Sequence, residues 1–131
     1  MKALAGTADG VFTVDLETEE VIGFDPDERL QPPSADVSLP RVIAAAASGS
    51  TVVAVVDTRP PLAVSHDAGV TWTQSGGGLP AGRAVAVADD DPDLVLYGAR
   101  NRLYLSRDGG RFWTALAPEL PEIETVDLRE V

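Results

Sequence analysis

An eight-residue pattern, Ser-x-Asp-x-Gly-x-x-Trp, occurs twice in this chain. It occupies residues 65–72 and 106–113, so the two copies stand 41 positions apart (106 − 65 = 41). Each copy follows a short apolar run. Within each copy, the aspartate can accept hydrogen bonds from the backbone of its own turn, and the glycine can take the positive φ that a tight turn needs. The pattern therefore predicts a structural repeat.

A second signal has nearly the same period. Leu39-Pro40, Leu79-Pro80 and Leu120-Pro121 each open a unit, 40 and then 41 positions apart (79 − 39 = 40; 120 − 79 = 41). Short apolar runs separated by Gly, Pro, Asp and Ser are typical of antiparallel strands. We predict an all-β chain with strands at 2–6, 11–14, 21–24, 42–47, 51–57, 62–65, 70–74, 84–88, 94–98, 102–106, 111–116 and 125–128.

These strands group into four segments of one domain. Residues 39–78 and 79–119 each hold four strands, whereas residues 1–38 hold three and lack a first strand. Residues 120–131 hold one spare first strand. Asp25 to Ser38 contains three prolines and no hydrophobic period, which predicts a long loop. Loops of this length are often functional, but here only Asp25, Asp27, Glu28 and Arg29 could do chemistry.

Period-41 units of four short strands are typical of β-propeller blades. The turn resembles the Asp-box, or BNR repeat, of sialidases, sortilin-type receptors and the photosystem II assembly factor. The resemblance covers residues 39–128. The amino-terminal unit departs from it, because Val14, Leu16 and Thr18 stand where the motif has Ser106, Asp108 and Gly110. The resemblance implies that the turn residues are structural: Ser65, Asp67, Gly69, Trp72, Ser106, Asp108, Gly110 and Trp113.

The strand count predicts three blades in each chain. Propellers usually have four to eight blades, so two copies would give six. We expect a two-fold homodimer in which residues 122–128 of each chain join the partner's sheet at Lys2 to Gly6. The main alternative is that the chain is a piece of a longer propeller; the initial Met and the strand balance favour the dimer.

Composition excludes several classes of partner. The net charge is −11, with 21 carboxylates against 10 basic side chains, so nucleic acid and anionic membranes would be repelled. The chain has no cysteine and therefore no disulfide or thiolate metal site. We expect no cofactor, no metal, and a cytoplasmic location, since no signal peptide or long apolar run is present. The Asp-rich, Lys-poor composition resembles that of proteins from salt-loving archaea.

The candidate binding residues are Arg41, Arg83 and Glu124. Each lies beside the start of a first strand, so all three should reach the mouth of a central channel. One hypothesis is a site for an anion or a peptide terminus, with a protein or a glycan as ligand. The favoured interpretation is a salt-bridge ring that balances charge in the channel. The single histidine, His66, occupies a variable position of the turn and should face solvent.

These observations favour a non-enzymatic binding or scaffolding module over two alternatives. The first alternative is a sialidase-like glycoside hydrolase, for which the sequence offers an arginine cluster and two tyrosines but no clear pair of working carboxylates. The second is a structural subunit of a larger assembly. The candidates for the hydrolase are Arg41, Arg59, Arg83, Arg100, Arg102, Tyr97 and Tyr104.

Overall fold

The computed structural model describes residues 1–130, and these form strands, turns and loops without a helix. Val131, the last residue of the segment predicted as a spare strand, lies outside the described residues. The twelve strands form three separate four-stranded antiparallel sheets, which confirms the all-β prediction. The absence of helices in this part of the chain also means that it holds no apolar helix of membrane-spanning length.

Each sheet is assembled mainly from strands that follow one another in the sequence. Sheet A has the order β12-β1-β2-β3, sheet B the order β4-β5-β6-β7, and sheet C the order β11-β10-β9-β8. The strands of sheet A are β1 (Lys2–Thr7), β2 (Gly10–Asp15), β3 (Val21–Asp25) and β12 (Ile123–Arg129). Those of sheet B are β4 (Val42–Ser48), β5 (Thr51–Val56), β6 (Leu62–Ser65) and β7 (Thr73–Ser75). Those of sheet C are β8 (Ala84–Ala88), β9 (Asp91–Ala99), β10 (Arg102–Ser106) and β11 (Thr114–Ala115).

The last strand completes the first sheet within the same chain. β12 pairs antiparallel with β1, from Lys2↔Arg129 to Thr7↔Ile123. The expectation that this strand would enter a partner's sheet is therefore corrected. The first residue of β12 and the segment before it are held against the turn between β9 and β10: Ile123 N donates to Arg100 O at 2.6 Å, and Leu120 N donates to Asn101 O at 2.8 Å. Because sheet C packs on sheet A, this attachment brings β12 to the free edge of β1 in its own chain.

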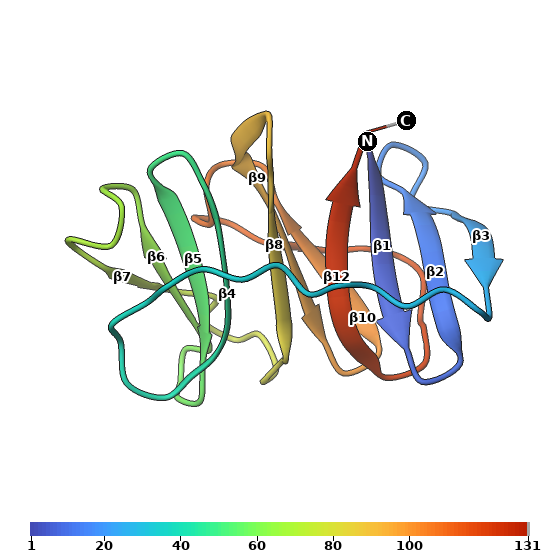
Figure 1. Ribbon diagram of the computed structural model, residues 1–131, viewed down its shortest axis with the longest axis horizontal. Coiled ribbons are helices and arrows are strands. Elements are labelled where there is room, and N and C mark those ends of the chain that lie inside the picture. The colour runs from blue at the N-terminus through green and yellow to red at the C-terminus, as the bar shows by residue number, and fades with distance from the viewer. Residues whose placement is uncertain (131) are drawn as a thin grey trace.

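The three sheets stack in the order B, C, A (Figure 1). One core lies between sheets B and C, where Val53, Val55 and Leu62 meet Val95 and Tyr97. A second core lies between sheets C and A and comprises, among others, Leu96, Leu103, Leu105, Ala3, Ala5 and Val14. Side chains alternate between the two faces of each strand, so β9 sends Val95 and Tyr97 to one core and Leu94 and Leu96 to the other. Sheet C is consequently covered on both faces.

The outermost strands of sheets B and C are shorter than predicted. β7 begins at Thr73 and β11 at Thr114, whereas the sequence predicted strands from residues 70 and 111. In both places an aspartate of the preceding turn holds the backbone N–H groups: Asp67 accepts from Thr71 N, and Asp108 from Phe112 N. Because those N–H groups cannot also bond to a neighbouring strand, β7 and β11 begin only after Trp72 and Trp113.

Residues 26–41 connect sheet A to sheet B, and we call this segment the strap. Because sheet C lies between these two sheets, the strap crosses the molecule in front of β12 and β8 (Figure 1). Its side chains alternate along most of its length: Leu30, Pro33, Ala35, Val37 and Leu39 are half-buried, and the residues between them are exposed. The predicted loop is thus an extended segment with one side against the protein.

Candidate binding site at the starts of the inner strands

The structure brings Arg83 and Glu124 together where two inner strands start. The inner strands are β4, β8 and β12, and β8 contacts the other two. Arg83 directly precedes β8, and its backbone N–H donates to Gly98 O at 3.2 Å. Its guanidinium lies 3.5 Å from Glu122 Oε2 and 3.9 Å from Glu124 Oε2, which come from the start of β12. One arginine therefore stands between two carboxylates.

The charge of this group favours a cationic ligand over an anion. Arg83 is 53% exposed, and the side chains of Glu122 and Glu124 are 68% and 47% exposed. Ion pairs this open to solvent contribute roughly 0–1 kcal/mol to stability, so their groups can turn to an incoming ligand at little cost. Two carboxylates exceed one guanidinium by one negative charge. An ammonium or guanidinium group would find the better match here.

Arg41 is not part of this cluster. It directly precedes β4 with a positive φ of 62°, and its carbonyl oxygen accepts a hydrogen bond from Asp57 N at 2.9 Å. No ion pair within residues 1–130 includes its guanidinium. Arg41 instead lines a hollow of about 250 Å³ on sheet B together with Pro40 and Trp72.

The sequence interpretation missed Glu122. Its signal was present, since Glu122 directly follows Leu120-Pro121 as Arg41 directly follows Leu39-Pro40. The prediction named Glu124, which stands three positions after Pro121 as Arg83 stands three positions after Pro80. In the structure both glutamates approach Arg83.

The two Ser-x-Asp turns share one hydrogen-bond pattern. Ser65 Oγ donates to Asp67 Oδ1 at 2.7 Å and accepts from Gly69 N at 2.8 Å. In the second turn Ser106 Oγ donates to Asp108 Oδ1 at 2.7 Å, and Gly110 N donates to Ser106 Oγ at 2.9 Å. Gly69 and Gly110 have φ values of 89° and 90°, a region that favours glycine.

Both aspartates of these turns are tied to their own backbone. Thr71 donates to Asp67 through its hydroxyl at 2.5 Å and through its N–H at 2.8 Å, and these bonds lower the pKa of Asp67 to about 2. The Phe112 N–H, followed by the Ser106 hydroxyl, lowers the pKa of Asp108. A carboxylate that accepts several local bonds is held ionised and oriented toward its turn. Neither aspartate points to catalysis.

The tryptophans of the two turns have different partners. Trp113 Nε1 donates to Ser75 Oγ of sheet B at 3.0 Å, and the Ser75 hydroxyl donates to Gly110 O of the second turn. Trp72 Nε1 donates to Gly69 O of its own turn at 3.1 Å. The second turn thus joins two sheets, whereas the first lies at the end of the stack.

Two of the residues proposed for a hydrolase, Tyr97 and Arg102, are held by contacts within the protein. Tyr97 is buried between sheets B and C, where its hydroxyl donates to Pro80 O at 2.7 Å and burial raises its pKa to about 12. Arg102 donates through Nη1 to Leu116 O at 3.2 Å and through Nη2 to Glu119 Oε1 at 2.9 Å. A phenol held in this way is a packing group and a poor nucleophile at neutral pH.

His66 and the acidic side chains offer no metal centre in the described part of the chain. His66 is exposed, as expected, and its Nδ1 lies 3.3 Å from Thr51 Oγ1. Among residues 1–130 no three His, Cys, Asp or Glu side chains are grouped so that they could hold a metal ion.

No protein-family model matches the chain, and no curated protein does so either.

Proposed function

We propose that this protein is a non-enzymatic binding or scaffolding module that acts as one half of a six-bladed β-propeller. The observation that carries the proposal is the stack of three four-stranded antiparallel sheets in the order B, C, A, with repeated contacts between inner strands. Such sheets are the building units of propellers, whose rings usually contain four to eight. Two copies of the chain supply six.

The proposed binding surface is the mouth at the starts of the inner strands. Arg83, Glu122 and Glu124 form an exposed group with one excess negative charge. A basic peptide, with lysine or arginine side chains or a free amino terminus, matches this charge. The net charge of −11 on the whole chain adds long-range attraction for such a partner.

The ring is tested by the mass of the protein in solution. Light scattering during gel filtration should give twice the chain mass of 13.7 kDa. A single mass of one chain at all concentrations up to the millimolar range would overturn the half-propeller.

The binding surface is tested with peptides that differ only in charge. A lysine-rich peptide should bind more tightly than its glutamate-rich counterpart in calorimetry, and the double variant Glu122→Gln/Glu124→Gln should weaken this binding. Glu20→Gln, a change of an exposed glutamate elsewhere, is the matched control. Equal affinity of the double variant and the control would remove the mouth as the binding surface.

A further inference from the structure

The stack repeats one kind of contact and stops at two free ends. Sheet B packs through Val53, Val55, Leu62 and Val64 onto the face of sheet C that carries Tyr97. Sheet C packs through its opposite face, with Leu103 and Leu105, onto sheet A. We call the faces of sheets A and B that point away from sheet C their outer faces. A further step of the same kind would place an outer face of sheet A against an outer face of sheet B.

The outer face of sheet B carries small side chains where sheet C carries large ones. In sheet B, Ala54 pairs with Ala63 on one side and with Ala45 on the other. In sheet C, Tyr97 pairs in the same way with Tyr104 and Val85. The residues of the outer face of sheet B are Ala45, Ala47, Val52, Ala54, Ala63 and Gln74. Ala47 and Gln74 are exposed, whereas the other four residues are at most 8% exposed. Because most of these side chains are small, another sheet can approach the backbone closely.

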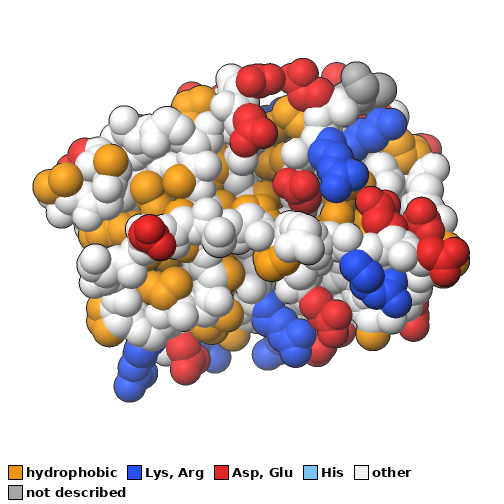
Figure 2. Space-filling model, in the orientation of Figure 1, with side chains coloured by type: hydrophobic (Ala, Val, Ile, Leu, Met, Phe, Trp, Pro, Cys, Tyr) orange, Lys and Arg blue, Asp and Glu red, His pale blue; other side chains and the backbone are white. Residues whose placement is uncertain are grey.

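Exposed hydrophobic side chains gather at the same two ends. Val21, Ile22 and Phe24 of sheet A and Ile43 of sheet B are 44–49% exposed. Val21 and Phe24 pair with Val14 and Phe12, so these two lie on the face of sheet A that is turned toward sheet C. The other large hydrophobic residues that are exposed within residues 1–130 are Val70 and Phe112, which belong to the two turns. In the view of Figure 2, hydrophobic side chains lie over sheet B with few charges among them. No strand of sheet C contributes a large exposed hydrophobic residue, as expected for a sheet already covered on both faces.

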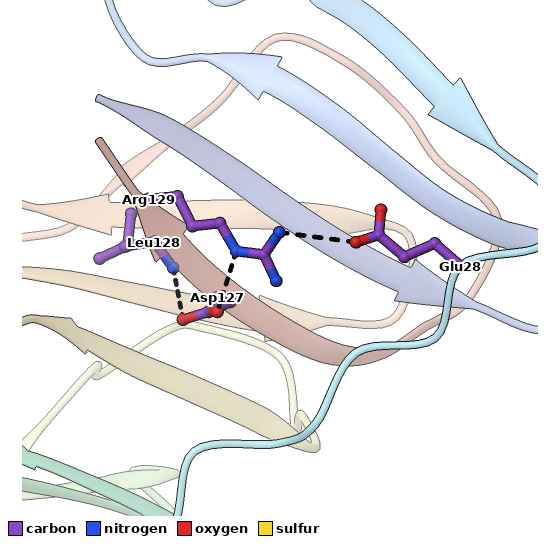
Figure 3. Close-up of polar contacts among 4 residues, drawn as sticks. All are labelled: Glu28, Asp127, Leu128 and Arg129. Carbon is purple, nitrogen blue, oxygen red and sulfur yellow. Dashed lines mark hydrogen bonds and ion pairs between the residues drawn. The ribbon is translucent and has the colours of Figure 1, made fainter. Parts of the chain in front are cut away.

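The strap occupies the outer face of sheet A. Gly6 lies on that face, because its neighbour Ala5 belongs to the core with sheet C. A Cβ atom placed on Gly6 would lie 3.6 Å from Leu30 Cδ1 of the strap. At the other end of β1, Arg129 Nη1 lies 3.5 Å from Glu28 Oε2 of the strap and Arg129 Nε lies 3.6 Å from Asp127 Oδ2 (Figure 3). The strap is therefore attached to β12 by an exposed ion pair.

We propose that the outer face of sheet B packs against the outer face of sheet A of a second copy, displacing the strap from that face. Two such contacts, related by a two-fold axis, close the ring of six sheets. The inference rests on the proposed half-propeller and adds the closing surface to it. It also gives the strap a role on that face, whose buried apolar residues are Leu4 and Val11 and whose other residues are mostly polar: it covers the face until a second copy arrives.

Substitution of an exposed residue on sheet B tests the contact. Ala47 is exposed on the outer face of β4, so Ala47→Glu places a charge in the contact without entering a core. Analytical ultracentrifugation should show dimer dissociation at concentrations at least about ten-fold higher than for the wild type. Gln74→Glu, at an exposed position of β7 on the same face, should have the same direction of effect. The matched control is Ala115→Glu, at an exposed position of β11 in the middle sheet C, which should leave the dimer unchanged.

Release of the strap should have the opposite effect. Glu28→Gln removes its ion pair with Arg129, and the loss of an exposed pair should tighten the dimer by about two- to five-fold. Glu20→Gln also removes one negative charge, but from a residue outside the strap, and should leave the affinity of the dimer unchanged.

The outcomes separate this contact from the half-propeller itself. A wild type that stays monomeric overturns both. A wild-type dimer that Ala47→Glu and Gln74→Glu weaken no more than Ala115→Glu does keeps the half-propeller and overturns this closing surface. A dimer equally tight in Glu28→Gln and Glu20→Gln overturns the displacement of the strap. Circular dichroism spectra like that of the wild type establish that each variant is folded.

Discussion

At the scale of single residues, hydrogen bonds to carboxylates fix the local structure. Asp15, Asp67 and Asp108 each accept backbone N–H groups two to four residues ahead in the chain. All three consequently have a pKa below the ordinary value of 3.8. The first sheet lacks the Ser-x-Asp pattern, yet Asp15 turns the chain there with a bond to Thr18 N at 3.1 Å. In each of the three sheets, therefore, an aspartate side chain that accepts backbone N–H groups forms a turn.

The lowered pKa of Asp67 predicts a loss of stability in acid. The pKa of the Asp67 carboxyl group is about 2 in the folded protein and near 3.8 in the unfolded chain. The ionised carboxylate is therefore more stable in the folded state than in the unfolded state. This contribution is complete above about pH 4 and disappears as the pH falls toward 2. Urea unfolding between pH 6 and pH 2 should show a smaller pH dependence for Asp67→Asn than for the wild type. Glu17→Gln, at an exposed turn position, should retain the dependence of the wild type; an unchanged slope in Asp67→Asn would contradict this view.

At the scale of elements, the sequence predicted the strands better than their pairing. The bounds of β6, β8 and β10 were predicted correctly, because apolar runs there end at clear turn residues. The fourth strands were predicted too long, since the sequence does not reveal how many N–H groups an aspartate will hold. The pairing of β12 with its own chain was missed because pairing within a chain and pairing between chains satisfy the same strand register.

An engineered disulfide tests the pairing of β12. Ala3 and Leu128 are direct partners on β1 and β12, and opposite residues of antiparallel strands lie about 4.5–5.5 Å apart at Cα, within disulfide reach. The chain has no cysteine, so Ala3→Cys/Leu128→Cys introduces the only two thiols. After oxidation, a non-reducing denaturing gel should show one-chain bands. Covalent dimers as the main product would indicate that β12 exchanges between chains, and the single variant Ala3→Cys provides the control for random cross-linking.

The hydroxyl of Ser75 is one polar link between sheets B and C, beside the bond from Ser48 Oγ to Asp89 O. It receives the Trp113 indole N–H and donates to Gly110 O. Ser75→Ala leaves both groups without this partner, so we expect a loss of about 1–3 kcal/mol in unfolding free energy. Thermal or urea unfolding measures the loss. Thr73→Ala, an exposed position on the same strand, should cost less than 1 kcal/mol by the usual range for surface changes; an equal loss in both variants would contradict the link.

At the scale of the whole molecule, the mouth and the strap were only partly visible in the sequence. Arg83 and Glu124 were expected to converge, because each was placed beside the start of a first strand. Arg41 was expected beside them, but it lines the hollow near Trp72 on sheet B. The strap was expected to be an irregular loop, because its alternating contacts arise from the stacking order B, C, A, which no local pattern encodes.

The high negative charge predicts stabilisation by salt. With a net charge of −11, the folded chain repels itself, and raising NaCl from 0.1 M to 1 M shortens the screening length from about 10 Å to about 3 Å. The melting temperature should rise over this range. Asp89→Asn/Asp90→Asn removes two exposed charges and should show a smaller rise. A melting temperature that falls with salt in the wild type would contradict the prediction.

The pairing of β1 with β12 sets the order in which this protein can fold as it leaves the ribosome. Lys2 and Arg129 are 127 positions apart (129 − 2 = 127), yet their strands lie side by side in Figure 1. Sheets B and C consist of consecutive strands and can form while synthesis continues. Sheet A is begun first and completed last. Until then β1 has an open edge, so chaperone contacts or premature pairing should concentrate on nascent chains that lack the last ten residues.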